Sequence, residues 1–371
     1  MLKKAKWKDD CLSPILLGID DLCDGYFKKD YEKIFPFFDA GYGALNDGSI
    51  FSYLDKNLLQ KYPEIKITFF VPFGKGAYWD KEKSIINNIF ERDEFGKFFN
   101  FILGCGYEIA YHGHDHGLIN STLDPNTWCC EFDQYSKEEY FDIIKSDLAK
   151  FKDRFGYEVH GGRSPGYKFK DDLIDGLCEC GFKWWSFDYK PFINNINLKY
   201  NGYNIIEMPS NLSGDMFNYS KNLIKSAAKY FLILYRLEYM IKGGQAVSIA
   251  EHFFRTRFDG KIQMPNIYND INSLDLIFGY LRNKDVWYAT FSECANYYES
   301  YKNTDILDVG NGVFEIKYKG DWKMFLTFIS DNRYLQNIQT KEIYEGFMKN
   351  NRWLFNDLVE GVYKERKDVF R

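Results

Sequence analysis

The sequence predicts an α/β protein in which the strands of a mostly parallel sheet alternate with helices. Short apolar runs with the length and composition of buried strands are the first observation behind this prediction. They lie at Ile15–Ile19, Lys66–Val71, Glu108–Tyr111, Val159–Gly162, Lys183–Phe187, Asn204–Met208, Ala246–Ala250 and Val286–Thr290. Stretches with apolar residues at helical spacing separate several of them, at Lys137–Phe155, Asp171–Gly181, Tyr219–Lys242 and Asn269–Asn283. This repeated order predicts a sheet closed into a (β/α) barrel or wound open.

Polar motifs that follow several of these runs are the second observation. They are Asp20–Asp21, His112–His116, Arg163–Pro165, Asp188 and His252. In α/β folds the chemistry gathers at the carboxyl ends of the parallel strands. The sequence therefore predicts a functional site at that end of the sheet.

The predicted barrel domain covers residues 1–302, and a smaller addition follows at 303–371. The addition contains two segments, Ile306–Tyr318 and Met324–Ile329, in which apolar residues alternate with polar ones or follow one another, with glycines in or between the segments. This pattern predicts a β-hairpin. Thr340–Lys367 carries apolar residues at helical spacing among many charges, which predicts a C-terminal helix. The expected architecture is a barrel with a small C-terminal hairpin and helix, whose role in dimerisation or partner docking stays open.

The composition limits the kinds of partner that the protein is expected to bind. The chain of 371 residues has a formal net charge of −5 and a pI near 5.7, so it lacks the basic field that gathers nucleic acid. We expect no nucleic-acid partner. The eight cysteines are scattered without a repeated Cys-x-x-Cys pair, and we expect them to be reduced, mostly buried thiols.

Neither a secretion signal nor a membrane span is visible in the sequence. The first ten residues lack the apolar core of a signal peptide, so a cytoplasmic location is expected. Apolar stretches such as Tyr230–Tyr235 are far shorter than the roughly 18 residues that cross a bilayer. The helix expected over Tyr219–Lys242 is amphipathic and basic enough to touch a membrane surface, although a core-facing helix is the favoured interpretation.

A histidine cluster predicts a metal site. Three of the five histidines lie within residues 112–116, directly after the apolar run Glu108–Tyr111. Neutral imidazole is a common ligand for zinc and similar ions, and a catalytic site needs about three protein ligands with one position open. Gly113 argues against a helix interior, so we expect a loop in which His112 and His116 converge on an ion.

Asp20 and Asp21 follow the first expected strand, Ile15–Ile19, and neighbouring side chains there point to different sides of the chain. Two carboxylates can then do two jobs. One can complete a His, His, Asp metal site while the other serves as general base for the attacking water.

In their order along the chain, these motifs resemble those of the polysaccharide deacetylase family, the carbohydrate esterases with a NodB homology domain. The resemblance covers about residues 12–300 and implies a distorted seven-stranded (β/α) barrel. The segments that carry it are Gly18–Asp21, His112–His116, Arg163–Gly166, Trp184–Asp188, Ala250–His252 and Trp287–Glu293. The chain departs from the family pattern at Leu22, Gly113, Gly166 and Ala250.

The resemblance implies a hydrolase that uses a divalent metal ion to remove an N- or O-acetyl group from a sugar. The ion, with zinc favoured, would be held by Asp21, His112 and His116. The extra imidazole of His114 is an alternative ligand. The expected substrate is an acetylated sugar, sugar nucleotide or oligosaccharide in bacterial surface polysaccharide or lipopolysaccharide biosynthesis, and a homo-oligomer stays open.

The resemblance also implies four catalytic residues. Asp20 would be the general base, Arg163 its charged partner, His252 the general acid and Asp188 the residue that orients His252. These roles agree with acid–base logic, because a leaving nitrogen needs a proton from a group that titrates near neutrality. The candidate substrate contacts are Trp185, Pro165 and Tyr167, although a core position is equally compatible with a tryptophan.

Two other functions remain open on the sequence. The segment His112–His116 is similar to the His-x-His-x-Asp-His run of metallo-β-lactamase-like hydrolases but is one residue short, and few further histidines remain for a binuclear site. A non-catalytic glycan-binding protein is the second alternative. The joint presence of Asp20, Arg163 and His252 argues against it, because a site without turnover needs neither a base nor an acid.

Overall fold

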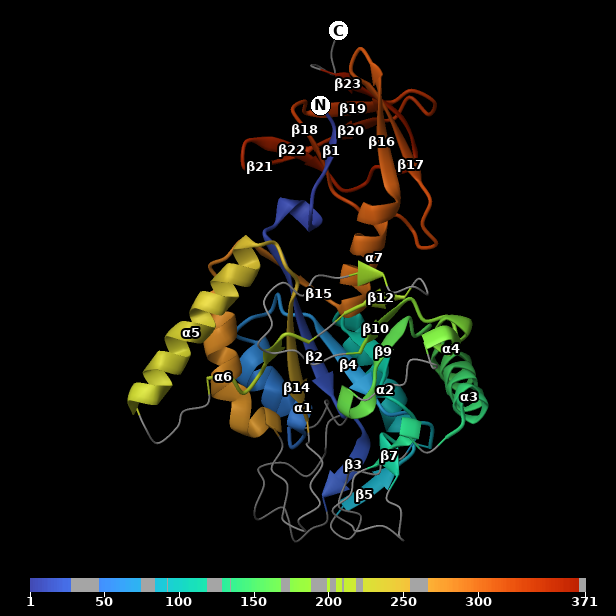
Figure 1. Ribbon diagram of the computed structural model, residues 1–371, viewed down its shortest axis with the longest axis vertical. Coiled ribbons are helices and arrows are strands. Elements are labelled where there is room, and N and C mark those ends of the chain that lie inside the picture. The colour runs from blue at the N-terminus through green and yellow to red at the C-terminus, as the bar shows by residue number, and fades with distance from the viewer. Residues whose placement is uncertain are drawn as a thin grey trace.

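The computed structural model describes residues 1–27, 47–74, 84–91, 93–118, 129–133, 135–167, 174–187, 199–200, 205–208, 210–217, 223–253 and 266–366. Its centre is a curled sheet flanked by helices (Figure 1). In spatial order the strands are β11 (Lys199–Tyr200), β12 (Ile206–Glu207), β10 (Trp184–Ser186), β9 (Gly161–Arg163), β6 (Glu108–Tyr111), β4 (Ile67–Val71), β2 (Ser13–Asp20), β14 (Val247–His252) and β13 (Leu212–Ser213). A further strand, β15 (Val286–Ala289), pairs with the first half of β2.

The strand directions confirm the predicted α/β class. All pairings along this path are parallel except that of β11 with β12, so eight consecutive strands, from β12 to β13, run in one direction. They form a half-barrel, and their carboxyl ends meet on one side. Every residue of β2 and β4 is buried, as expected where both faces of a parallel sheet are covered.

Seven α-helices are found among the described residues. They are α1 (Ile50–Leu54), α2 (Asp93–Gly104), α3 (Lys137–Phe155), α4 (Ile174–Glu179), α5 (Leu223–Lys242), α6 (Asn266–Leu281) and α7 (Phe291–Asn303). The helix predicted over Lys137–Phe155 from its apolar spacing is confirmed as α3 with the same bounds. In the structure a capping box at Ser136 begins it and left-handed Gly156 ends it. Helices α5 and α6 cover one flank of the sheet, and α3 and α4 lie on the other (Figure 1).

Two small antiparallel pairs lie beyond the carboxyl ends of the central strands. One joins β3 (Asp24–Phe27) to β5 (Ser84–Asn87), and the other joins β7 (Gly117–Leu118) to β8 (Cys129–Cys130). The second pair brings Glu131, at the start of a short 3-10 helix (Glu131–Asp133), close to the histidine loop.

The C-terminal region is a separate stack of antiparallel strands. One sheet has the order β16 (Thr304–Gly310), β17 (Val313–Tyr318), β23 (Gly361–Arg366), β19 (Tyr334–Asn337) and β20 (Ile343–Glu345). The other has the order β1 (Lys3–Lys4), β18 (Phe328–Ser330), β22 (Arg352–Phe355) and β21 (Phe347–Lys349). The hairpin predicted over Ile306–Tyr318 is confirmed as β16 and β17, while the start of the chain contributes β1 to the same region (Figure 1).

The prediction of a helix over Thr340–Lys367 is wrong. That segment forms the four strands β20 to β23. Asn350 and Asn351 both adopt left-handed backbone angles (φ 50° and 60°) at the tight turn between β21 and β22. Two such residues in succession stop a helix and match the twist of a hairpin, so the turn decides the structure over the apolar spacing.

Candidate metal centre

The site begins where β2 ends. Parallel pairing sets Asp20 opposite His252 on β14 and opposite Phe70 on β4, so the ends of three strands meet here. Asp21, the next residue, has a left-handed backbone (φ 69°), which turns the chain sharply after the strand. Both carboxylates are buried, at 1% and 2% exposure. The predicted division of the pair into two differently placed groups is what the structure shows.

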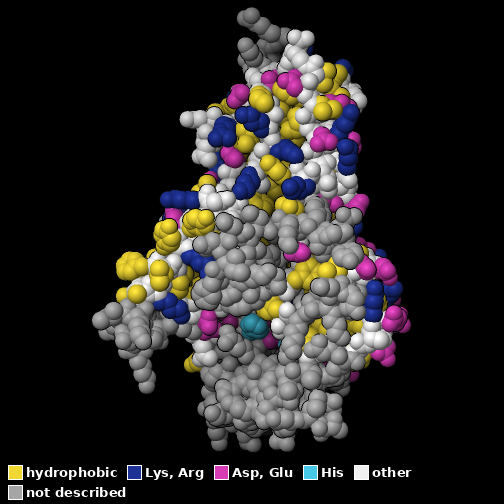
Figure 2. All heavy atoms as spheres, viewed as in Figure 1, with side chains coloured by type: hydrophobic (Ala, Val, Ile, Leu, Met, Phe, Trp, Pro, Cys, Tyr) yellow, Lys and Arg dark blue, Asp and Glu magenta, His cyan; other side chains and the backbone are white. Residues whose placement is uncertain are grey.

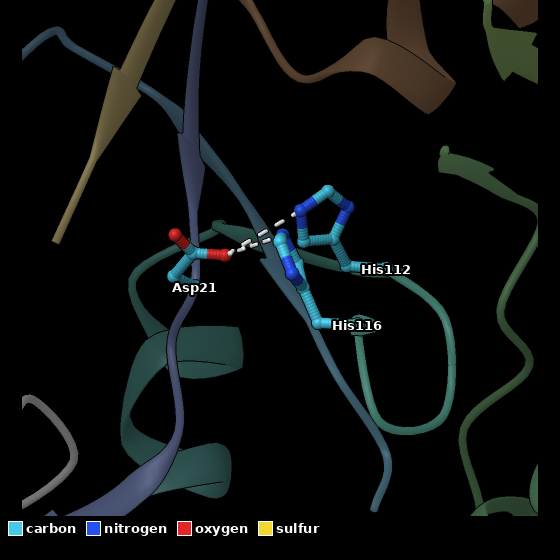
Figure 3. Close-up of side chains that lie close together, drawn as sticks. All are labelled: Asp21, His112 and His116. Carbon is cyan, nitrogen blue, oxygen red and sulfur yellow. Dashed lines mark ion pairs between the residues drawn. The ribbon is translucent and has the colours of Figure 1, made fainter. Parts of the chain in front are cut away.

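The second part of the site is the loop after β6. The backbone N–H of His112 donates to the Val71 carbonyl, which ties the loop to β4. Gly113 (φ 80°) and His116 (φ 62°) take left-handed angles, and these two turns bring both imidazoles to the same side. Figure 3 shows the two rings pointing at the Asp21 carboxylate.

Asp21, His112 and His116 form a compact set of donor atoms. The Asp21 Oδ1 atom lies 3.5 Å from His112 Nε2 and 3.4 Å from His116 Nε2 (Figure 3). The three donor atoms all lie within 4.8 Å of one another, and all three residues are buried. Two imidazole nitrogens and a carboxylate oxygen are the donor types that zinc and similar divalent ions accept.

A hydrogen bond fixes the orientation of His112. Its Nδ1 lies 2.9 Å from the Arg163 carbonyl oxygen, which can only accept, so Nδ1 carries the proton. Nε2 is then the ring nitrogen that faces Asp21. A backbone carbonyl behind a histidine ligand is a common way to set the tautomer for metal binding.

The pKa shifts of two of the three donors, His116 and Asp21, fit a cation. Burial disfavours the charged form of the third, His112, but the neighbouring Asp20 and Asp21 outweigh it and raise its pKa. Burial lowers the pKa of His116 to about 3, so its imidazole is neutral at neutral pH. Burial opposes ionisation of Asp21, but the nearby His116 and His112 outweigh it and lower its pKa. Metal ligands need this combination of neutral imidazole and ionised carboxylate.

Arg163 holds the second carboxylate. Its guanidinium is fully buried, lies 3.9 Å from the centre of the Phe70 ring, and donates from Nη1 to Asp20 Oδ1 at 2.5 Å. A side chain at Gly18 would clash with this arrangement, because its Cβ would lie 3.0 Å from the guanidinium and 2.9 Å from Phe70. Packing therefore requires a glycine at position 18, because a larger side chain would displace Arg163 or Phe70.

His252 completes the site at the surface. Its Nε2 lies 3.6 Å from Asp20 Oδ2, and its side chain is 27% exposed. Asp20 Oδ2 also lies 3.9 Å from His112 Nε2. The expected base thus sits between the metal donors and the expected acid, while Asp188, expected to orient His252, lies outside the described residues.

His114 turns away from this group. Its Nδ1 lies 2.9 Å from Asp147 Oδ2 on α3, and the same carboxylate oxygen accepts from the Tyr111 hydroxyl at 3.0 Å. The hydrogen bond to Asp147 raises the pKa of His114. The structure therefore places the alternative ligand in a different network, behind the loop.

Sequence reasoning missed Glu131. Its fully buried carboxylate accepts the backbone N–H groups of His114 (2.8 Å) and Asp115 (2.6 Å), between the two histidine donors. A Cβ on Gly113 would lie 2.0 Å from Glu131 Oε1, so the glycine makes room for this carboxylate. Burial raises the pKa of Glu131 to about 7. No spacing rule pointed to it, since it reaches the loop from another element.

Ser210 was missed for the same reason. It is fully buried, and its Oγ accepts from Arg163 Nη2 at 2.9 Å and from the Tyr167 hydroxyl at 3.1 Å. It links the guanidinium to Tyr167, the half-buried member of the expected substrate contacts.

Two expected substrate contacts are buried in the structure. Trp185 is fully buried and donates its indole N–H to Ser164 Oγ at 2.9 Å, so it is a core residue. Trp184 is equally buried. Pro165 is buried too, against the Gly113 turn. Both lie on or beside strands covered on two faces, where an aromatic or proline side chain packs inward.

Comparisons with known proteins give structural matches alone. Neither a family model nor a curated relative matches the chain. Among solved structures, the peptidoglycan deacetylase PdaC from Bacillus subtilis matches at 14% identity, with 76% of this chain and 89% of that chain covered and a TM-score of 0.38. A Puue allantoinase matches at 11% identity, with 79% and 92% covered and a TM-score of 0.46.

A pseudoenzyme of carbohydrate esterase family 4 from Bacillus anthracis, BA3943, matches at 12% identity, with 76% of this chain and 65% of that chain covered and a TM-score of 0.38. The matching structures thus include deacetylases of the kind that the sequence motifs resemble. They also include an allantoinase and a pseudoenzyme, and their TM-scores stay below 0.5. Any inference about activity must therefore come from the site of this chain.

Proposed function

We propose that this protein is a metal-dependent hydrolase that removes an acetyl group from a sugar, with an N-acetyl group favoured. The observation that carries the proposal is the grouping of three buried donors, Asp21, His112 and His116, next to a second carboxylate held by a buried arginine. The imidazole of His252 beside the same carboxylate is partly exposed, so a substrate can reach it. This arrangement supplies a cation position, a base and an acid within one site.

A divalent ion, with zinc favoured, would be held by Asp21, His112 and His116, and it supplies Lewis-acid polarisation of the carbonyl and acidification of water. The chain's own groups supply the proton transfers. Arg163 occupies Asp20 Oδ1, which leaves Oδ2 as the atom that accepts a proton from the attacking water. Arg163 also fixes the orientation of this carboxylate, since its own position is set by Ser186 and Ser210.

His252 acts on the leaving group. Its Nε2 lies 3.6 Å from Asp20 Oδ2, so the proposed acid and the proposed base lie side by side in the site. An amine leaving from a sugar needs a proton to depart, and an imidazole at the mouth of the site can deliver it. We further propose that the substrate belongs to bacterial surface polysaccharide or lipopolysaccharide assembly and that the protein acts in the cytoplasm.

The test couples metal content to acetate release. The native chain and Asp20→Asn are loaded with zinc, their metal content is measured by elemental mass spectrometry, and acetate is assayed with UDP-N-acetylglucosamine and N-acetylated oligosaccharides. We expect about one ion per chain in both proteins and acetate release from the native protein alone. A loaded native chain that releases no acetate but hydrolyses allantoin, or only binds the sugars, would overturn the proposal in favour of a ureide hydrolase or a glycan-binding protein.

A further inference from the structure

Helix α5 is apolar on two faces. Its inner face buries Ile233, Leu237, Met240 and Ile241 and packs against β14 and β2, as predicted for a core-facing helix. Its outer face carries Phe231, Leu232, Tyr235 and Tyr239, which are 69%, 69%, 73% and 43% exposed. A surface helix of a globular protein normally presents charged and polar residues there. Packing against the core accounts for the apolar inner face but not for the apolar outer face.

The outer side chains form a continuous ridge. Phe231, Tyr235 and Tyr239 are four residues apart, which stacks them along one side of the helix, and Leu232 lies beside Phe231. Among the described residues, fourteen large hydrophobic side chains are exposed, and four of them are on this helix. Figure 1 shows α5 at the outer flank of the sheet, and Figure 2 shows hydrophobic side chains gathered there with basic ones beside them. Clustered exposure of this kind marks an interaction surface.

The charges around the ridge are mainly positive. Lys6, Lys229 and Lys242 are exposed beside it. The neighbouring acid, Glu238, is held by Lys284 at 2.7 Å and by Lys242 at 3.2 Å. The whole chain carries a net charge of −5, so the charge around the ridge is opposite in sign to the net charge of the chain. A hollow of about 500 Å³, lined in part by Lys6, Tyr235, Tyr239 and Lys242, opens at the end of the ridge.

We propose that the outer face of α5 binds the surface of an anionic lipid bilayer. Phe231, Leu232 and Tyr235 would enter the boundary between head groups and acyl chains, and the lysines would contact lipid phosphates. Among the described helices, none is long and apolar enough to cross a bilayer, so the contact proposed is peripheral. Lysine is depleted in protein–protein interfaces, whereas a lysine rim around aromatic residues suits anionic lipid, which favours a membrane over a protein partner.

The test is flotation of the full-length chain with vesicles of phosphatidylcholine alone or with about one third phosphatidylglycerol. We expect the native protein to float with the anionic vesicles and to be released by salt, because screening weakens contacts with charged lipid. The variant Phe231→Ser/Leu232→Ser/Tyr235→Ser should lose binding. Lys229→Glu/Lys242→Glu should weaken it on the order of tenfold or more, because each basic residue near a charged surface contributes several-fold to affinity.

A matched control removes the same kind of side chain elsewhere. Leu307→Ser/Val309→Ser/Met348→Ser deletes three exposed apolar side chains from the C-terminal sheets and should bind vesicles as the native chain does. Thermal unfolding of every variant verifies the fold. The proposal is overturned if the native chain floats with neither vesicle, if the control loses binding equally, or if light scattering shows a native dimer that the α5 variant dissociates. Vesicle binding is measured without turnover, so the outcome is independent of the proposed function.

Discussion

Two buried polar networks lie on opposite sides of residues 112–116. In front of the loop, Asp21, His112 and His116 direct three donor atoms at one another within 4.8 Å. Behind it, His114 and Asp147 are joined at 2.9 Å, and Glu131 takes two backbone N–H groups. The front network groups three donor atoms of the kinds that divalent ions accept, whereas the rear network satisfies its polar groups internally. Three histidines of one short segment thus have different roles, because alternate side chains leave the loop in different directions.

Removing a donor from the front network should have the largest effect. We expect Asp21→Asn and His116→Ala to lose the ion and to reduce turnover by on the order of 10³-fold or more, since the polarisation supplied by a catalytic ion is worth several kcal/mol. His114→Ala should keep the ion, because its imidazole faces Asp147. Competition with a chromophoric zinc chelator measures all three affinities. Equal losses in His114→Ala and His116→Ala would erase the distinction between the networks.

Asp20→Asn should separate catalysis from metal binding within the front network. Asp20 lies against the donors but pairs with Arg163, so its loss removes the base and leaves the three donors in place. We expect turnover to fall by roughly 10² to 10⁴-fold, the usual contribution of a general base. Metal stoichiometry should stay near that of the native chain. Loss of the ion in this variant would mean that Asp20 is itself a ligand.

The rear network should make stability depend on pH. Burial raises the pKa of Glu131 from 4.5 to about 7, so between these values the folded chain keeps a proton that the unfolded chain has released. Stability must then fall as the pH rises through this window, by up to about 3 kcal/mol from this group.

Urea unfolding of the metal-free protein between pH 4.5 and 8 measures this dependence. The variant Glu131→Gln cannot titrate at this position, so the difference between the native chain and the variant isolates Glu131 from the other titrating groups. We expect the native curve to fall more steeply than that of the variant as the pH rises. Parallel curves would show that Glu131 keeps an ordinary pKa and that the rear network is wetter than the structure indicates.

The front network and the residues around it could be predicted from the sequence to a large extent. Asp20, Asp21, His112, Arg163 and His252 each follow or end an apolar run, and parallel strands bring such ends together without further information. The order of the motifs then supplied their roles. The sequence could not decide whether Trp185 lies in the core or contacts the substrate, because an aromatic residue beside a strand end has the same sequence pattern in both places.

The rear network and the C-terminal sheets were not predictable in the same way. Glu131 reaches the loop from beyond a segment of chain that has no periodic pattern, so nothing in its neighbourhood marks its partner. In the C-terminal region, Leu354 and Leu358 fit a helical stripe, yet Asn350–Asn351 impose a hairpin. Turn residues were the available signal there, and they outweigh apolar spacing when a segment is short.

The smallest expected effect is the change in metal affinity when Glu131, a residue of the rear network, is substituted. The Glu131 carboxylate fixes the backbone between the histidine donors from behind, at 2.8 Å and 2.6 Å. A glutamine there must turn an amide N–H₂ toward one of these N–H donors and lose that bond. We expect Glu131→Gln to weaken metal affinity by about 10 to 100-fold, the range for groups that orient ligands without touching the ion. Metal titration at pH 8, where the native carboxylate is ionised, measures the change.

Glu138→Gln is the matched control, because Glu138 is an exposed carboxylate on the neighbouring helix α3. It removes the same charge without touching the loop and should leave metal affinity unchanged. If both variants bind the ion as the native chain does, the front network holds its geometry unaided. If only Glu131→Gln weakens it, the position of His112 and His116 depends on a carboxylate that neither histidine contacts, and the two networks act as one structural unit.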